Sequence, residues 1–114
     1  MRAKIYVAGP YTKGDVAQNV ASALTAAEEL VARGFAPFVP HLTHFWHIFH
    51  YHPYEFWLSL DKEFLLCCDG LLRLPGVSNG ADEETATAID AQMPVFYSVE
   101  DVDRYYPSGK GGGQ

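Results

Sequence analysis

A turn of small residues followed by three acidic side chains is the stretch of this chain best suited to chemistry. Residues 78–84 read Ser-Asn-Gly-Ala-Asp-Glu-Glu, a pattern that predicts a capped helix beginning at Ala81. Acidic residues in a first helical turn also favour the positive end of the helix dipole, so the three acids have a purely structural explanation. Glu84 differs from its two neighbours because it lies three residues after Ala81 and four before Ala88, at the border of the packing face. A carboxylate held there can act as a nucleophile or base, and we expect Glu84 to be catalytic.

The segment before this turn indicates where Glu84 should lie. Residues 70–74 form a short apolar run with the length of one buried strand, and Pro75 and Gly76 end it. A strand, a loop and a helix N-terminus therefore follow one another. In open α/β sheets, ligands bind beyond the carboxyl ends of the strands, where a helix N-terminus offers free backbone N–H groups.

Strands and helices alternate along the rest of the chain. The periodicity predicts strands over 4–8, 35–39, 71–74 and 94–97, and helices over 15–33, 54–68, 81–90 and 100–105. Pro37 predicts that the second strand is an edge strand or very short. In the helix over 54–68, Asp61, Lys62 and Glu63 should lie mostly opposite the apolar side, which includes Phe64 and Leu65. The order of strands and helices predicts βαβ units and a small three-layer α/β sandwich around a parallel sheet of about four to five strands. We expect one domain over residues 1–107 and a flexible tail over 108–114.

The loops after the first three strands, residues 9–13, 41–53 and 75–84, should meet at one end of that sheet. Residues 9–14 include a lysine but lack the glycine spacing of a Walker A loop or a dinucleotide fingerprint, so we expect no nucleotide cofactor. A single monophosphate at a helix N-terminus, with Lys13 or Ser78 assisting, stays an option.

All five histidines lie within residues 41–52, among aromatic side chains. Imidazole is a common zinc ligand, so a metal protein is one interpretation of this segment. Residues three apart drift around a helix, however, and no further ligand pattern accompanies them. We favour imidazoles and aromatic rings that line a pocket or an interface, with no metal.

Composition narrows the classes of function. With 14 acidic and 8 basic residues the formal charge is −6, and the basic residues are scattered, which disfavours nucleic acid as a partner. No apolar run has the length of a membrane span, and we expect no membrane partner. The adjacent Cys67 and Cys68 indicate buried thiols in a reducing compartment, and we expect a cytoplasmic protein.

Four motifs together resemble the nucleoside 2-deoxyribosyltransferase-like superfamily, and most closely its small DUF4406 branch. They are Lys4-Ile-Tyr-Val-Ala-Gly-Pro-Tyr, Pro40-His41-Leu42, Cys68-Asp69 and Ser78-x-Gly80-Ala81-x-x-Glu84-x-x-x-Ala88. The resemblance extends to about Tyr97. It implies a Rossmann-like, flavodoxin-like fold, and cleavage or transfer of the N-glycosidic bond of nucleosides or their 5′-monophosphates.

The resemblance also implies roles for individual residues. Glu84 matches the nucleophile and Asp69 an aspartate that orients sugar or base, while Tyr11, after Gly9-Pro10, would line the sugar and base pocket. In the monophosphate-hydrolysing branch, Ser78 and Gly80 would hold the phosphate. Members assemble as dimers or larger homo-oligomers. Either Asp69 or a pocket histidine such as His41 could protonate the departing base.

Two classes of function therefore compete. The first is an N-glycosidase or deoxyribosyltransferase that works through Glu84 on a small nucleoside or nucleotide. The second is a module that binds a nucleotide in the same crevice without turning it over, whose signature would be stabilisation by the ligand alone.

Overall fold

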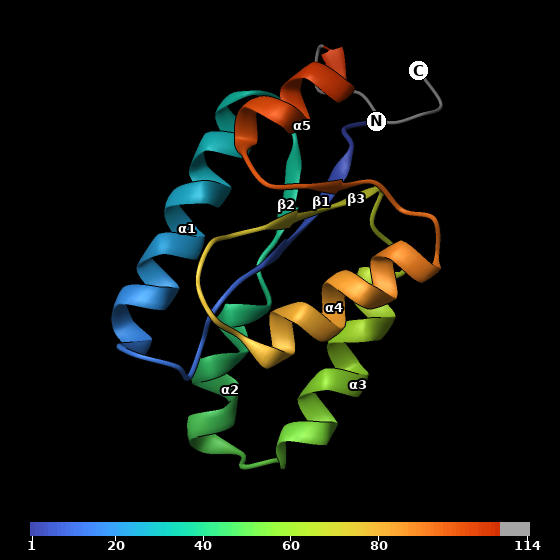
Figure 1. Ribbon diagram of the computed structural model, residues 1–114. Helices are drawn as coiled ribbons and strands as arrows, with labels where there is room; N and C mark the ends of the chain where they lie inside the picture. The colour runs from blue at the N-terminus through green and yellow to red at the C-terminus, as the bar shows by residue number, and fades with distance from the viewer. Residues whose placement is uncertain (108–114) are drawn as a thin grey trace.

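The computed structural model describes residues 1–107, and a central parallel sheet organises them (Figure 1). Within this range the strands are β1 (Lys4–Ala8), β2 (Ala36–Phe38), β3 (Gly70–Arg73) and β4 (Val95–Phe96), in the order β2-β1-β3-β4. Every pair is parallel, and β1 sets the register by pairing Tyr6 with both Phe38 and Leu71. The predicted α/β fold class is confirmed, with Pro37 on an edge strand as expected.

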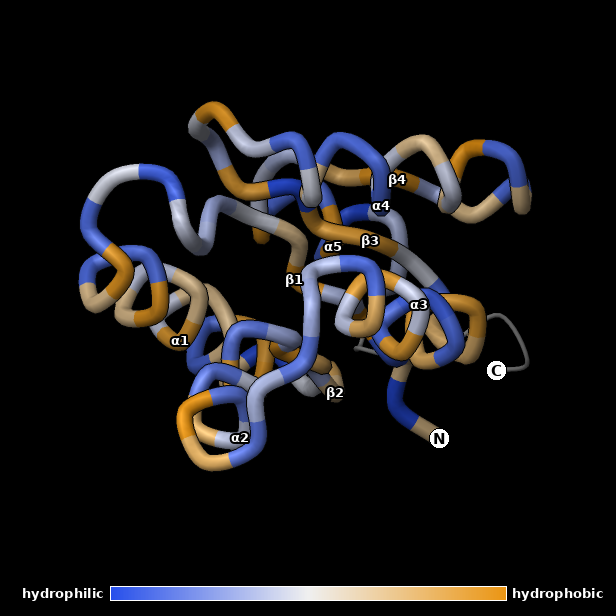
Figure 2. Tube along the Cα trace, turned by 90° about the horizontal axis from the view of Figure 1, so that it is seen from below, coloured by the Kyte–Doolittle hydropathy of each residue, from blue (hydrophilic) through white to orange (hydrophobic). Residues whose placement is uncertain are grey.

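Helices cover both faces of the sheet. They are α1 (Val16–Ala32), α2 (Thr43–Phe49), α3 (Tyr54–Leu65), α4 (Asn79–Asp90) and α5 (Val99–Tyr105), with a short 3-10 turn, η1 (Pro40–Leu42), before α2. α1 and α5 share a buried cluster with one face of the sheet, and α3 and α4 share a second cluster with the other face. Figure 2 shows the hydrophobic strands enclosed between these helices. The molecule therefore has three layers.

Alternation along β1 decides which side chains reach each layer. Successive strand residues point to opposite faces. Ile5 and Val7 accordingly belong to the cluster with α1, while Tyr6 and Ala8 belong to the cluster with α3 and α4. Tyr6 is thereby directed from the centre of the sheet toward the helix that carries Glu84.

Local sequence signals fix the helix ends. Asp15 caps α1 by accepting a hydrogen bond from the backbone N–H of Gln18, and Gly34 follows the helix with a φ of +93°. Ser78 caps α4 by accepting from the N–H of Ala81 at 3.1 Å. These side-chain caps satisfy backbone N–H groups that have no partner inside a helix, and glycine adopts the positive φ without steric cost.

Several predicted boundaries need correction. α3 ends at Leu65 instead of Cys68, so both cysteines lie in the following turn, where Cys67 is exposed and not buried. α4 begins at Asn79, two residues early, and residues 40–49 form η1 and α2. None of the helices in residues 1–107 has the length and apolar character needed to cross a lipid bilayer. The predicted tail, residues 108–114, lies outside the described residues.

Candidate active site

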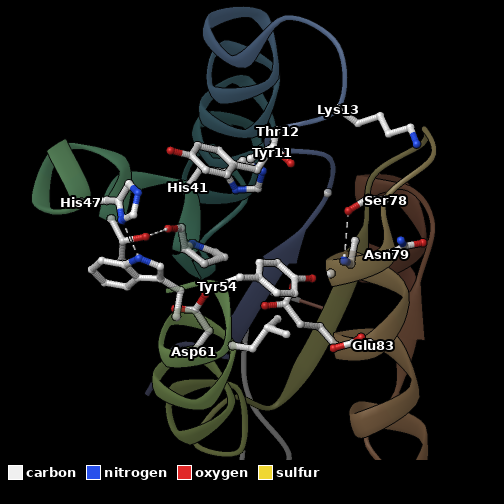
Figure 3. A pocket seen from close by; sticks show the side chains of 18 of the residues that line it. Tyr11, Thr12, Lys13, His41, His47, Tyr54, Asp61, Ser78, Asn79 and Glu83 are labelled. Carbon is white, nitrogen blue, oxygen red and sulfur yellow. Dashed lines mark hydrogen bonds between the residues drawn. The ribbon is translucent and has the colours of Figure 1, made fainter. Parts of the chain in front are cut away.

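A cavity of about 660 Å³ opens at the carboxyl ends of β1 and β2 (Figure 3). The loop after β1, the segment from η1 to α3, and the N-terminal turn of α4 form its walls, as the crossover topology predicts. The residues that line it include Gly9, Tyr11, Lys13, His41, His52, Tyr54, Trp57, Asp61, Ser78, Gly80, Glu83 and Glu84. Every site residue predicted from the sequence lies here except Asp69.

Glu84 is held at the base of α4 by the central strand. The hydroxyl of Tyr6 donates a hydrogen bond to Glu84 Oε2, and the Tyr6 side chain is fully buried. Burial raises the pKa of Glu84 to about 7; the Tyr6 hydrogen bond opposes this shift, and the nearby Asp61 carboxyl adds to it. Burial and the neighbouring Glu84 carboxylate raise the pKa of Tyr6 far above its usual range, so the Tyr6 hydroxyl stays protonated and donates the hydrogen bond. Glu84 is therefore a positioned carboxylate that titrates near neutral pH.

Asp61 is a second carboxyl group at the cavity, and the sequence prediction put it on the wrong side of its helix. We expected Asp61 to face outward with Lys62 and Glu63, but Asp61 is only 8% exposed. Its Oδ1 has no hydrogen-bond partner among residues 1–107, and burial raises its pKa to about 7. A carboxyl group with that pKa can donate a proton at neutral pH.

The helical spacing does contain the signal that was missed. Tyr54, Trp57, Leu58 and Asp61 all line the cavity, and they follow one another at i, i+3, i+4 and i+7, which is one face of a helix. The apolar face expected from the sequence includes Phe64 and Leu65. Asp61 lies on the adjoining face and is charged, so the sequence pattern alone predicts that it is exposed to solvent.

Asp69 is not brought to the cavity. It directly precedes β3, at the amino end of the sheet, where its Oδ2 accepts a hydrogen bond from the Lys4 backbone N–H at 2.7 Å. Its carbonyl oxygen accepts a hydrogen bond from the Tyr106 hydroxyl at 3.2 Å. These contacts tie the start of β1 to β3 and to the C-terminal segment. The predicted catalytic role of Asp69 does not fit this placement, because a parallel sheet separates its two ends by the length of the strands.

His41 lies buried in the cavity wall, only 5% exposed. The contact between its Nε2 and the carbonyl oxygen of Pro10 measures 3.0 Å. Since a carbonyl can only accept, Nε2 carries the proton. Burial lowers the pKa of His41, so the ring is neutral at pH 7 and Nδ1 has a free lone pair. Nδ1 has no partner within the described part of the chain.

Two tyrosines flank the cavity. The Tyr11 hydroxyl forms a hydrogen bond with Nδ1 of His44, and its ring meets the His41 ring edge-on at 6.2 Å. Tyr54 lies across from it, against α4 (Figure 3). A Cβ atom on Gly80 would come within 3.0 Å of the Tyr54 hydroxyl oxygen, so the missing side chain of Gly80 makes room for Tyr54. Both rings line the cavity.

The mouth of the cavity has donors for an anion. Ser78 caps the N-terminus of α4, and Ser78 and Lys13 both line the cavity (Figure 3). The positive end of a helix dipole together with a lysine ammonium group favours a negatively charged ligand.

The five histidines serve separate purposes. His47 accepts a hydrogen bond from Trp57 Nε1 at 2.8 Å, His52 stacks on Phe56 at 3.8 Å, and His50 is exposed. In residues 1–107, no three His, Cys, Asp or Glu side chains gather in a way that could hold a metal ion. The aromatic segment thus builds one wall of the cavity.

Comparison with known proteins gives a family and a structural neighbour. The model of the domain of unknown function DUF7768 matches residues 3–98, and the chain belongs to that family. The matching family is thus not the DUF4406 branch that the sequence motifs suggested. No curated protein matches the sequence.

Among solved structures, the chain is similar to a 2-deoxyribosyltransferase from the psychrotolerant bacterium Bacillus psychrosaccharolyticus. The TM-score is 0.67 at 20% sequence identity, and the match covers 93% of this chain and 94% of the other. This likeness establishes a shared fold, in agreement with the Rossmann-like architecture that the motifs implied.

Proposed function

We propose that this protein cleaves the N-glycosidic bond of a nucleoside or nucleoside 5′-monophosphate, with Glu84 as the nucleophile. The observation that carries the proposal is the Glu84 carboxylate, oriented by the buried Tyr6 hydroxyl and facing the cavity at the carboxyl end of the sheet. This chain shares its fold with a 2-deoxyribosyltransferase, and that likeness supports the same class of reaction.

In the first step, a carboxylate oxygen of Glu84 attacks C1′ of the sugar. The C1′–N bond breaks, its electron pair leaves with the base, and a glycosyl ester forms on Glu84. The transition state has oxocarbenium character, which the negative carboxylate stabilises. The hydrogen bond from Tyr6 favours the ionised form of Glu84, which is the form that reacts.

The departing base needs a proton, and Asp61 is the group best suited to supply it. Its carboxyl is buried in the same cavity, and its raised pKa keeps a substantial protonated fraction at neutral pH. His41 is a poor acid, because its ring is neutral and its single N–H is engaged by Pro10. Glu84 as the nucleophile and Asp61 as the general acid would thus act together in cleaving the C1′–N bond.

The second step decides between hydrolase and transferase. Water that attacks C1′ of the ester releases free sugar, whereas a second base that attacks there receives the sugar. Tyr11 and Tyr54 line the cavity and would contact the base, and Ser78, Gly80 and Lys13, which line it too, would hold a 5′-phosphate if the substrate carries one.

The molecule also has a surface that suits self-association. α2 buries none of its residues, and the exposed fractions of Phe45, Ile48 and Phe49 are 61%, 58% and 78%. Large exposed apolar patches mark interaction surfaces, and we infer that this one joins copies of the chain into a homo-oligomer. Light scattering should then give a mass above the monomer value.

A base-release assay tests the proposed function. The protein is incubated with the common deoxynucleosides, ribonucleosides and their 5′-monophosphates, and free base is measured by chromatography. We expect release from at least one of them, and none above background with Glu84→Gln. Ligand-dependent thermal stabilisation without release from any of them would instead indicate a non-catalytic binding module.

A further inference from the structure

The candidate active-site cavity carries more acidic than basic side chains. Asp61, Glu83 and Glu84 line it, and among the described residues Lys13 is the one lysine or arginine that does so. The ion pairs within residues 1–107 involve none of these three acids. Since charges that are taken out of water in proteins are nearly always paired, a cavity wall of this composition suits a ligand that brings a positive charge.

Asp61 is the acid whose missing partner points most directly to a ligand. The residue is 8% exposed, its Oδ1 has no hydrogen-bond partner in residues 1–107, and it lies in the cavity wall (Figure 3). Burial raises the pKa of Asp61 to about 7, and the Asp61 carboxyl in turn adds to the raised pKa of Glu84. Lys13 lies at the opposite side of the site in Figure 3. A cation bound beside Asp61 would therefore favour the ionised form of both carboxyl groups.

Aromatic rings supply a second attraction for a cation in the same cavity. Tyr11, Tyr51, Tyr54 and Trp57 line it together with the three acids. The face of an aromatic ring attracts positive charge, and tryptophan does so most strongly. Trp57 lies four residues before Asp61, one turn along the cavity-facing side of α3, and its Nε1 donates to Nδ1 of His47 at 2.8 Å. A rigidly held ring and a buried carboxyl group are thus neighbours on one helix face.

Nucleosides differ in the charge of the base. The common bases are neutral, whereas a base joined to the sugar through a quaternary nitrogen, as in a pyridinium nucleoside, carries a fixed positive charge. When Glu84 attacks C1′ of such a nucleoside, the C1′–N bond breaks, its electron pair returns to the ring nitrogen, and the base leaves as a neutral molecule without a proton. Positive charge moves from the base to the sugar, so an acidic cavity attracts the ligand in the ground state and in the transition state.

We propose that the preferred ligands of this cavity are nucleosides whose base carries a fixed positive charge, held by Asp61, Glu83 and the ring of Trp57. This inference rests on the proposed function for the nucleoside class. Attraction between charges needs no alignment of donor and acceptor atoms, so it follows from which residues line the wall. Neutral nucleosides are then weaker ligands, whose base Asp61 must protonate. We expect a cationic base to bind at least about ten-fold more tightly than a neutral base of the same shape.

Two small molecules of equal shape test the proposal without turnover. 1-Methylnicotinamide is a pyridinium cation, and 3-methylbenzamide is its neutral counterpart with carbon in place of the charged nitrogen. Neither has a glycosidic bond, so wild-type protein is titrated with each and the dissociation constants are measured by NMR. The titrations are run at pH 8, where carboxyl groups with a pKa of about 7 are mostly ionised. The cation should bind at least about ten-fold more tightly. Equal binding, tighter binding of the neutral compound, or no binding of either overturns the proposal.

A variant then assigns the preference to the buried acid. Asp61→Asn keeps the shape of the side chain and removes its charge, so the ratio between the two dissociation constants should fall at least about three-fold. Glu63→Gln is the matched control, because Glu63 is an exposed acid on α3 outside the cavity wall, and the ratio should be unchanged. If circular dichroism shows that Asp61→Asn does not fold, the same fall is expected and measured in Glu83→Gln. An unchanged ratio in the folded variant contradicts the proposal.

The base-release assay separates this inference from the proposed catalysis when a pyridinium nucleoside joins the panel. If the charge preference is found while wild-type protein releases no base from any nucleoside, the cation-binding cavity stands and the proposed catalysis fails. If base is released from neutral nucleosides while the two small molecules bind equally, the proposed function stands and the preference for a cationic base fails.

Discussion

The hydroxyl of Tyr6, in the middle of β1, donates its hydrogen bond to the carboxylate of Glu84, in the first turns of α4. These residues are 78 positions apart in the sequence, and the βαβ topology brings them together beneath the cavity. The contact links the most buried part of the sheet to the residue that we propose as the nucleophile. Its consequences can be tested one residue at a time.

Replacing Glu84 with glutamine keeps the shape of the side chain and removes its charge. Loss of a nucleophile typically lowers kcat by at least about a thousand-fold, and we expect a loss of this size in base release. Glu63→Gln is the control, since Glu63 is an exposed acid on α3 outside the cavity wall. Steady-state kinetics on both variants, with folding verified by circular dichroism, measures the difference; equal losses would argue against a specific role for Glu84.

Replacing Tyr6 with phenylalanine removes the hydrogen bond that favours the ionised form of Glu84. The pKa of Glu84 should therefore rise further, and the acid limb of the activity profile should move to higher pH. A hydrogen bond to a charged group is worth about 1.5–3 kcal/mol, so we expect kcat near neutral pH to fall about ten-fold or more.

Tyr106→Phe is the matched control for this variant. Tyr106 is also buried and also uses its hydroxyl in one hydrogen bond, to the Asp69 carbonyl, away from the cavity. Its loss can lower stability but should not move the pH profile. An acid limb that stays in place in Tyr6→Phe would mean that Tyr6 has no role beyond packing.

Asp61 and Asp69 are two candidates for the general acid that protonates the departing base. Asp61 lines the cavity, whereas Asp69 lies at the amino end of the sheet. Asp61→Asn should lower kcat by about 10²–10⁴-fold, the usual contribution of a positioned acid, while Asp69→Asn should stay near the wild-type value. The loss should be much smaller for a nucleoside of 7-methylguanine, whose base already carries a positive charge and leaves without a proton. A large loss in Asp69→Asn with an active Asp61→Asn would reverse the assignment.

The raised pKa values of Asp61 and Glu84 also make a prediction about stability. Both folded values are about 7, above the ordinary values of the unfolded chain, so the folded state binds more protons between about pH 4 and 7. Stability due to these groups is therefore lost as pH rises through that range. Asp61→Asn should then stabilise the protein at pH 8 by at least about 1 kcal/mol, since one pKa unit corresponds to about 1.4 kcal/mol.

Thermal unfolding of Asp61→Asn and of the wild type at pH 8 and pH 4 measures this effect. The gain should be much smaller at pH 4, where the folded carboxyl is almost fully protonated and that of the unfolded chain, with its ordinary pKa, is close to half protonated. Glu63→Gln, the exposed control, should show no comparable gain at either pH. A destabilised Asp61→Asn at pH 8 would mean that the carboxylate has a partner that the cavity geometry does not reveal.

Local sequence patterns predict much of the fold and part of the candidate site. The spacing of apolar runs, the caps Asp15 and Ser78, and Gly34 predict the order of strands and helices because each depends on neighbouring residues. The same order predicts which loops meet, and so places Tyr11, His41 and Glu84 at one cavity.

What could not be predicted depends on tertiary packing. Asp61 is polar, and polarity alone assigns it to solvent, since only the packing of α3 beside the cavity buries it. Asp69 precedes the predicted strand over 71–74, so the parallel topology already indicated the amino end of the sheet, and the catalytic role assigned to Asp69 came from the family resemblance alone. The contact between Tyr6 and Glu84 likewise has no signature in the local sequence.

Mass spectrometry of the protein during turnover tests the central claim most directly. The protein is mixed with the best substrate of the release assay, quenched in acid within milliseconds to seconds, and digested for peptide mapping. A mass increase of one sugar residue should appear on the peptide that contains Glu84, and should be absent from Glu84→Gln. Base release with the sugar attached to another side chain, or undiminished release by Glu84→Gln, would contradict a glycosyl ester on Glu84.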